Sequence, residues 1–334
     1  MIPTPYFLYI GRAQDPADIK TSRGLAVFRP EACVGEFAHD DATQTLRLPR
    51  LSFAQAVEAG AKTFVLGVAM AGGALSPQLI DDALDAIRAG LNVAAGLHQR
   101  LRDQPALVAA AREAGVHLFD VRDPPADLPV GNGRRRAGNR VLTVGTDCSA
   151  GKMFTTLALT TALRARGVKA DFRATGQTGI LVAGAGVPLD AVVADFISGA
   201  IEVLSPARDD GGWDLIEGQG SLFHPSFAGV STGLLHGAQA RALVMCHDPL
   251  RPHLRGLPHY PVPDVASCLE ENLRVARLTS PHVVAAGVAL NTSAMAEDAA
   301  RDLCARTAEE TGLPCTDPYR FGADVIVERL LGLP

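Results

Sequence analysis

A lysine that follows two glycines at the end of an apolar run is the clearest chemical signal in this sequence. The uncharged, largely β-branched run 141–144 stops at Gly145, small and polar residues follow, and Gly151-Lys152 leads into the helix-forming residues 157–159. Glycines let the backbone turn so that successive N–H groups point at one anion, and the dipole of the following helix adds to the attraction. The pattern predicts a strand, a phosphate-binding loop carrying a mobile cation, and a helix.

This loop departs from the usual phosphate-loop motif in two ways. Five residues lie between Gly145 and Gly151, where the standard motif has four. Met153 stands where a Ser or Thr hydroxyl would bind magnesium. We therefore expect phosphate binding and disfavour nucleotide hydrolysis; the plainer alternative is a strand-to-helix turn with a solvated lysine. The residues expected to hold a phosphate-bearing ligand are Gly145, Thr146, Asp147, Cys148, Ser149, Ala150, Gly151, Lys152 and Met153.

Three residues further along the chain are candidates for proton transfer. The segment 213–221 is a short strand that delivers Glu217 into a glycine-rich turn, and His224 follows at the same edge. An imidazole titrates near neutrality and can take a proton from an amine, although a structural histidine is the equal alternative. Asp195 is flanked by apolar residues in an expected helix, 188–199. A carboxylate there is either paired, catalytic or on an ordinary exposed helix face.

Cationic and polar side chains at expected loops are candidates to hold an anionic substrate. These are Lys20, Arg173, Gln177, Thr178, Arg251 and Arg255. Gln177 and Thr178 belong to a second glycine-rich turn, which a parallel sheet would bring beside the first because neighbouring strands share one crevice. Solvation or turn formation explains these residues as well. Asn291 follows the expected strand 282–290 and offers a donor and an acceptor that suit the edge of a base, or a helix cap.

Alternating strands and helices must position these residues. Strands are expected at 6–10, 25–28, 63–68, 91–95, 116–121, 141–145, 170–175, the start of 213–221, 242–247 and 282–290, and helices at 54–60, 77–89, 105–114, 152–166, 188–199, 296–310 and 323–331. A basic loop is expected at 20–24 and a turn at 71–73. Such alternation implies parallel sheets with helices on both faces.

A Pro/Gly-rich, basic stretch without periodicity is the best domain boundary. We therefore predict an α/β protein with an N-terminal Rossmann-like parallel-sheet domain at 1–122, a linker at 123–139 and a C-terminal P-loop NTPase-like α/β domain at 140–334. A length of 334 residues is sufficient for two domains, each with its own core.

The composition restricts the class of function. The formal net charge of −5 argues against a nucleic-acid binder, and no apolar segment is long enough to span a membrane. The six cysteines are dispersed without C-x-x-C spacing, so we expect neither a zinc cluster nor a disulfide framework. The first residues lack the basic start and long apolar run of a signal peptide, so we expect none. We expect a cytoplasmic enzyme that acts on a small molecule.

Four segments in combination carry a family resemblance. The residues 145–153, 174–179, 195–196 and 217–222 together resemble the D-glutamate N-acetyltransferase family, long known only as two-domain phosphate-loop proteins. The resemblance covers nearly the whole chain. It implies an N-acyltransferase that moves the acetyl group of acetyl-CoA to the amine of D-glutamate, in D-amino acid catabolism. We also expect a homo-oligomer, whose size the sequence leaves open.

The phosphate loop, the Glu217-Gly218 turn and the strand ending at Asn291 are also similar to dethiobiotin synthetase, whose loop has the same five-residue spacing. Met153 replaces a threonine of that enzyme, which puts Mg-ATP chemistry in doubt and favours a phosphate-bearing cofactor, such as coenzyme A, that is bound without being cleaved. The alternative is a Mg-ATP-dependent small-molecule kinase or ligase in which Asp147 and Glu217 hold magnesium. A third hypothesis is a nucleotide-sensing module without turnover.

Acetyl transfer requires an anchor for the CoA phosphates, a base and donors for the oxyanion. We assign the anchor to the loop amides and Lys152, and the oxyanion donors to backbone amides of the turn 218–220. His224 or Glu217 is the expected base, with Asp195 behind them, and no metal is required. For the two carboxylates of the substrate we expect the cations Lys20, Arg173, Arg251 and Arg255.

Overall fold

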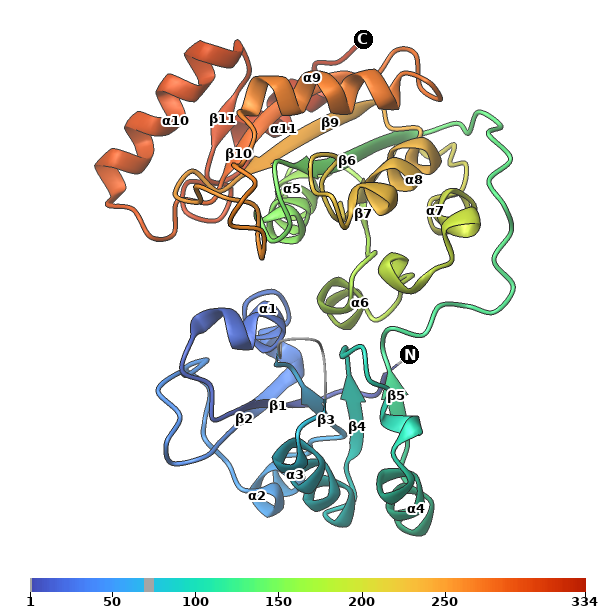
Figure 1. The fold of residues 1–334 in the computed structure, drawn as a ribbon, viewed down its shortest axis with the longest axis vertical. Helices are drawn as coiled ribbons and strands as arrows, with labels where there is room; N and C mark the ends of the chain where they lie inside the picture. Colours follow the sequence, from blue (N-terminus) through green and yellow to red (C-terminus); the bar gives the residue numbers. More distant parts are fainter. Residues whose placement is uncertain (1, 69–74) are drawn as a thin grey trace. The chain divides into compact units, whose positions relative to one another are not determined.

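Two parallel sheets form where short apolar strands alternate with helices. The computed structural model describes residues 2–68 and 75–334, so the turn expected at 71–73 lies outside the described residues. The chain divides into two compact units (Figure 1). The first contains the residues up to Pro124 and the segment Gly176–Pro188, and the second contains Pro125–Thr175 and Leu189–Pro334. The α/β class with a parallel sheet in each unit is confirmed.

The first unit contains a five-stranded parallel sheet in the order β2-β1-β3-β4-β5. Its strands are β1 (Tyr6–Gly11), β2 (Cys33–Ala38), β3 (Thr63–Leu66), β4 (Asn92–Ala95) and β5 (Leu118–Asp120). Its helices are α1 (Lys20–Phe28), α2 (Phe53–Glu58), α3 (Pro77–Arg88), α4 (Pro105–Ala114) and α6 (Gln177–Ala183), with 3₁₀ turns η1 (Pro16–Ile19), η2 (Pro30–Ala32) and η4 (Leu101–Asp103). Helices α1 and α6 pack together, as do α3 and α4, on opposite faces of the sheet (Figure 1).

Three sequence predictions in this unit are wrong: the loop 20–24, the strand 25–28 and the glycine-rich turn 176–179. The expected loop 20–24 and strand 25–28 form the single helix α1, whose buried residues recur with helical spacing at Thr21, Gly24 and Leu25. Short apolar runs do not distinguish strand from helix, which explains the error. The glycine-rich turn expected at 176–179 instead begins α6. Ser76 caps α3, since its Oγ accepts from Leu79 N at 3.2 Å.

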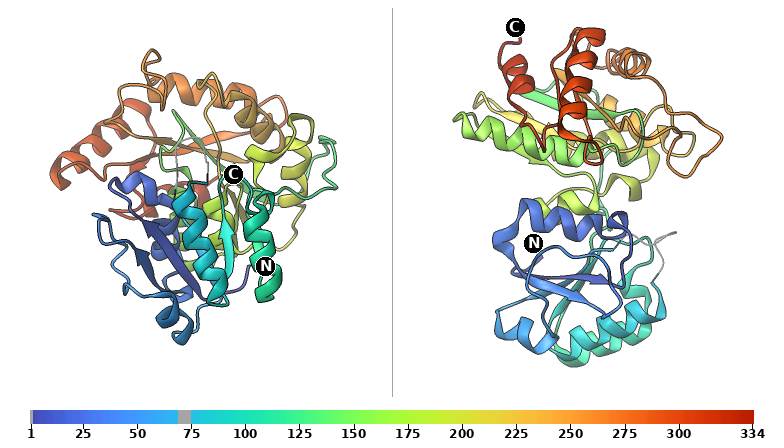
Figure 2. Two further views of the ribbon diagram at one scale, coloured as in Figure 1. Left: turned by 60° about the horizontal axis from the view of Figure 1, so that its bottom comes forward. Right: turned by 90° about the vertical axis from the view of Figure 1, so that its left-hand side faces the viewer.

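The second unit contains a six-stranded parallel sheet in the order β11-β10-β9-β6-β8-β7. Its strands are β6 (Asn139–Gly145), β7 (Ala170–Arg173), β8 (Trp213–Ile216), β9 (Ala242–His247), β10 (Val284–Leu290) and β11 (Cys315–Thr316). Its helices are α5 (Lys152–Ala165), α7 (Ile197–Leu204), α8 (Ala228–Ala238), α9 (Val265–Ala276), α10 (Glu297–Thr311) and α11 (Asp324–Leu331). Helix α8 packs beside α7 and α9, and α5 packs against α11 (Figure 2).

The helix expected at 188–199 is wrong over most of its length. The 3₁₀ turns η5 (Leu189–Ala191) and η6 (Ala194–Phe196) occupy this segment, and α7 begins only at Ile197. Val193 separates the two turns with an extended backbone, at φ −59° and ψ 137°, which is typical of a β-branched residue that resists helix. None of the helices in the described ranges combines the length and the apolar character of a membrane span.

Candidate functional site

The phosphate loop connects the central strand β6 to α5. Gly151 has a left-handed backbone with φ 99°, a value that glycine adopts without strain. Ser149 also has a positive φ, of 53°. Within the described residues, the amides of Ser149, Ala150 and Gly151 donate no hydrogen bond. Unpaired amides at the start of a helix are the usual donors to a bound phosphate. The loop therefore has a backbone that could bind an anion, and phosphate binding at these residues stays a prediction.

Lys152 is buried inside this loop. Its Nζ donates to the carbonyl of Asp147 at 2.8 Å, and a Cβ on Gly145 would lie 3.2 Å from that nitrogen, so a glycine keeps the space open. Burial lowers the pKa of Lys152. Lys152 forms no ion pair with a carboxylate in the described part of the chain, so an anionic ligand would supply the missing countercharge.

The Asp147 carboxylate connects the phosphate loop to the loop that contains Arg251 and Arg255. Its Oδ2 accepts from Arg251 Nη1 at 2.7 Å and from the Arg255 amide at 2.8 Å, and its Oδ1 accepts from the Cys148 amide at 2.6 Å. Arg255 also donates to Ser149 Oγ at 2.5 Å. Two guanidinium groups are thereby held at the loop. A magnesium ion on Asp147, as the kinase or ligase alternative requires, would have to displace these donors.

Glu217 lies beside the loop at the end of β8. Its Oε2 accepts from the Thr175 amide at 2.8 Å, and Thr175 Oγ1 donates to the Glu217 carbonyl at 2.6 Å. The next residue must be glycine, because a Cβ on Gly218 would lie 1.7 Å from the Thr143 carbonyl and 2.9 Å from Lys152 Cδ. The turn therefore packs directly against the aliphatic part of Lys152 and brings a buried carboxylate to the phosphate loop.

The other two candidates for proton transfer have different surroundings. His224 Nδ1 accepts from the Ser226 amide at 3.2 Å, so its Nε2 carries the proton and donates to the Arg255 carbonyl at 3.2 Å. With both ring nitrogens engaged, His224 is a structural link between two loops in this arrangement. Asp195 is exposed on η6. Of the three, Glu217 has the placement that a base requires; the catalytic assignment itself stays a prediction.

Asp147, Cys148 and His224 also form a set of potential metal ligands. A carboxylate oxygen, a thiol and an imidazole nitrogen lie within 4.8 Å of one another. The carboxylate is already ion-paired with Arg251, and the imidazole is hydrogen-bonded at both nitrogens. Burial raises the pKa of the Cys148 thiol, which opposes formation of the thiolate that a metal would need. We assign the cluster to the hydrogen-bonded frame of the loop.

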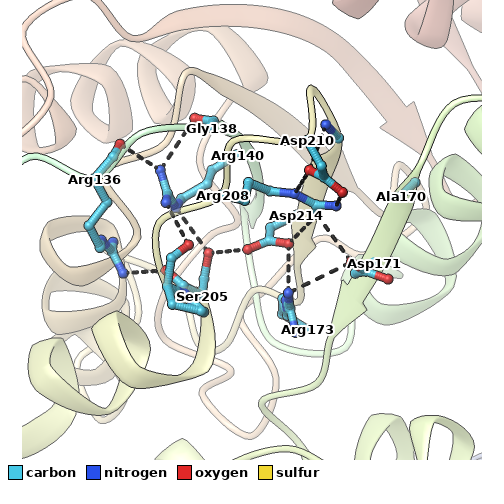
Figure 3. Close-up of polar contacts among 12 residues, drawn as sticks. Arg136, Gly138, Arg140, Ala170, Asp171, Arg173, Ser205, Arg208, Asp210 and Asp214 are labelled. Carbon is cyan, nitrogen blue, oxygen red and sulfur yellow. Dashed lines mark hydrogen bonds and ion pairs between the residues drawn. The ribbon is translucent and has the colours of Figure 1, made fainter.

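The structure separates the candidates for substrate binding into three groups. Arg251 and Arg255 lie at the phosphate loop, as described above. Arg173 instead turns to Asp214, at 3.0 Å (Figure 3). The remaining candidates belong to the first unit: Lys20 begins α1, and Gln177 and Thr178 begin α6. Thr178 Oγ1 lies 2.8 Å from Thr21 Oγ1. All six assignments stay predictions.

Three further polar residues, Asn291, Thr143 and Asp317, belong to the strands of the second sheet or follow them directly. A Cβ on Gly151 would lie 3.9 Å from Asn291 Cβ, which places Asn291 next to the start of α5. Thr143, whose hydroxyl accepts from the Gly218 amide at 3.0 Å, and the buried Asp317 are not among the residues predicted from the sequence. Their signal, a polar residue inside or just after an apolar strand, is too common to be selective.

A phosphate loop at the central strand of a parallel sheet, with a second parallel-sheet unit, defines a P-loop α/β protein of two domains. Residues 129–327 match the family described as a domain of unknown function (DUF1611_C) P-loop domain, and residues 31–124 match its DUF1611_N Rossmann-like domain. The chain belongs to this DUF1611 family, which includes proteins named D-glutamate N-acetyltransferase.

Two such relatives match this chain over nearly their whole length. A D-glutamate N-acetyltransferase of Pseudoalteromonas sp is 46% identical over 98% of this chain and 99% of its own. Another, from Tritonibacter scottomollicae, is 46% identical over 99% of both chains. A crystal structure of a DUF1611 family protein from Anabaena variabilis superposes with a TM-score of 0.90 at 35% identity, covering 99% of this chain and 100% of that one.

Proposed function

We propose that this protein is an N-acyltransferase that moves an acetyl group to the amine of D-glutamate, giving N-acetyl-D-glutamate. The observation that carries the proposal is the 46% identity, over nearly the full length of both chains, to two proteins named for this reaction. At such coverage both domains and the loop between β6 and α5 are included in the likeness. The resemblance seen in the sequence motifs points to the same activity.

We propose acetyl-CoA as the acyl donor. Unpaired amides at the start of α5 and the buried ammonium of Lys152 suit its phosphates. Met153 lacks a hydroxyl for magnesium, and the Asp147 carboxylate is occupied by Arg251 and the Arg255 amide. A cofactor whose phosphates are bound and never cleaved fits these features better than Mg-ATP does. The guanidinium groups of Arg251 and Arg255 are our candidates for the carboxylates of D-glutamate.

The chemistry we propose uses the turn after β8. Glu217 takes a proton from the substrate ammonium, and the free amine attacks the thioester carbonyl. The tetrahedral oxyanion receives hydrogen bonds from the amides of Gln219 and Gly220, which donate to no other group within the described residues. The C–S bond then breaks, the leaving thiolate takes up the second proton that the attacking nitrogen loses, and Glu217 releases the first proton to solvent. The Gly218 amide is unsuited, because it donates to Thr143 Oγ1.

Release of free CoA thiol from acetyl-CoA tests the proposal. Reactions with D-glutamate, L-glutamate and no acceptor are compared, with EDTA present in all of them. We expect thiol release with D-glutamate alone. No release under any condition, together with ATP turnover once magnesium is restored, would move the protein to the kinase or ligase class. Tight binding of a nucleotide without turnover would favour the sensing module.

We propose a cytoplasmic location and a role in D-glutamate breakdown. All six cysteines are free thiols, which is the state that a reducing compartment maintains. The homo-oligomer expected from the sequence stays a prediction, and light scattering of the purified protein would test it.

A further inference from the structure

Beyond the phosphate loop, the ends of β10 and β11 present an aromatic ring that the proposed reaction does not use. Tyr319 follows β11, and 61% of its surface is exposed. Its ring packs edge-to-face on Phe154, with the centroids 5.9 Å apart and the planes at 84°. Phe154 belongs to the first turn of α5, directly after Lys152 and Met153. Tyr319 therefore contacts the first turn of α5, the helix whose start would hold a phosphate.

Asn291 provides a polar group on the same side of the loop. Its Cβ lies close to Gly151, as described above, and its Oδ1 accepts from the Ser293 amide at 3.4 Å. Its side-chain nitrogen donates to no residue in the described part of the chain. An amide that is half-buried beside the loop therefore keeps two donors available for a ligand.

A buried carboxylate fixes these two residues relative to each other. Asp317 Oδ2 accepts from the amide and the hydroxyl of Thr292, at 2.9 and 2.7 Å, directly after Asn291. Its Oδ1 accepts from the amides of Tyr319, at 3.0 Å, and Arg320, at 3.2 Å. Arg320 donates in turn to the Thr292 carbonyl at 2.7 Å. The two loops are thus held in one arrangement before any ligand binds, which reduces the entropy lost on binding.

An aromatic ring and a side-chain amide beside an anion-binding loop are suited to one class of ligand, a purine nucleotide. The ring stacks on either face of the base, and the amide donates to a ring nitrogen at its edge. We propose that Tyr319 and Asn291 hold the adenine of an adenosine phosphate whose phosphate lies on the loop. Given the function proposed above, this is the nucleotide end of acetyl-CoA, and the acyl arm extends toward Glu217 on the opposite flank of β6.

Binding of adenosine 3′,5′-bisphosphate tests the site without requiring turnover. Calorimetry on the full chain should show that Tyr319→Ala weakens binding on the order of tenfold, the loss of one base–aromatic stack. Tyr319→Phe keeps the ring and should bind like the wild type. Leu278→Ala removes another large exposed side chain, 74% exposed, and should change nothing. Equal affinity of Tyr319→Ala and the wild type, or no binding by the wild type, would overturn the proposal.

Kinetics with two acyl donors then test whether the nucleotide end of acetyl-CoA is the part that lies at Tyr319. For acetyl-CoA, Tyr319→Ala should raise KM on the order of tenfold and leave kcat unchanged. For S-acetyl-pantetheine, which has no nucleotide, the variant and the wild type should have the same kcat/KM. An equal loss with both donors would contradict the assignment. If the wild type transfers no acetyl group, the proposed function fails, while the calorimetry still decides whether the adenosine site exists.

Discussion

The two ends of the second sheet use the same residue types for different purposes. Near the amino ends of β6, β7 and β8, Asp214 is fully buried and accepts from Ser205 Oγ at 2.5 Å, Arg208 at 2.7 Å and Arg173 at 3.0 Å (Figure 3). Arg140 donates to Ser205 Oγ and to four backbone carbonyls. Both oxygens of the central carboxylate therefore have partners, and the buried Arg173 Nε is the atom of this network that has none within the described residues.

The carboxyl ends of the same strands differ in what remains unsatisfied. Lys152 is buried without a carboxylate partner, and the amides of Ser149, Ala150 and Gly151 have no acceptor within the described residues. A buried charge without a countercharge is costly for folding and is retained where a ligand supplies that countercharge, as a phosphate would for Lys152. From this comparison we expect substitutions at the amino end to affect mainly stability and substitutions at the carboxyl end to affect mainly activity.

Asp214→Asn gives the largest expected effect on stability. It leaves the buried Arg140 and the partly buried Arg208 and Arg173 around a neutral amide. Removing one partner of a buried ion pair typically costs about 3–5 kcal/mol. The free energy of unfolding in urea measures the loss. At a temperature where the variant is folded, its KM for acetyl-CoA should equal that of the wild type. Asp209→Asn, on the exposed residue nearby, is the control and should keep wild-type stability.

The comparison would break if Asp214→Asn left stability unchanged and instead raised KM. The network would then belong to the binding site, as the sequence predicts for Arg173. That expectation shows what the sequence cannot reveal. Arg173 ends a strand as a substrate-binding residue should, but the register of β7 and β8 places Asp171 opposite Asp214 and turns Arg173 toward that carboxylate. The sequence around Arg251 and Arg255 carries no clearer signal for substrate binding than that around Arg173, yet both side chains contact the phosphate loop.

Local patterns were sufficient for the phosphate loop and for most of both sheets. Gly145, Gly151 and Lys152 predict strand, loop and helix because the turn itself requires those residue types. Helix α1 was missed because four apolar residues suit either a strand or a helix, and only packing against the sheet decides between them. The role of His224 could not be predicted either, since it depends on contacts with Ser226 and with the distant Arg255 carbonyl.

Glu217→Gln sharpens the comparison at the carboxyl end. The amide cannot take a proton from the ammonium, so we expect kcat to fall at least about a hundredfold, the lower range for general base catalysis. The KM for acetyl-CoA should stay near its wild-type value. His224→Gln is the matched variant, and we expect a smaller loss of kcat. A larger loss in His224→Gln, with intact folding, would transfer the assignment of the base to His224.

Lys152→Met separates binding from stability at one position. Burial disfavours the charged ammonium, as the lowered pKa of Lys152 indicates, and methionine carries no charge at this position. The free energy of unfolding should therefore stay the same or rise. The KM for acetyl-CoA should rise about 10- to 100-fold, as expected for losing a hydrogen bond between a charged donor and a phosphate. Lys62→Met, on an exposed lysine of the first unit, is the control for both measurements. A strong loss of stability with unchanged KM would make Lys152 a structural residue.

The smallest expected effect is a pH dependence from His247, which contributes to stability at the carboxyl end. His247 Nδ1 lies 2.9 Å from Thr146 Oγ1, and burial lowers the pKa of the imidazole. Because the folded pKa is below the unfolded one, the unfolded state takes up the proton first as pH falls. Stability should therefore decrease on acidification below the unfolded pKa, by at most about 1.4 kcal/mol per pH unit.

Urea unfolding of the wild type and His247→Gln between neutral pH and the folded pKa of the imidazole isolates this contribution, since the carboxylates titrate alike in both proteins. The difference in unfolding free energy should shrink steadily as pH falls. His259→Gln, on an exposed histidine, should follow the wild-type curve. Parallel curves for the wild type and His247→Gln would show that His247 does not couple the loop to folding. The carboxyl end would then contribute to stability only through its strands, and its contrast with the ion-pair network at the amino end would be greater.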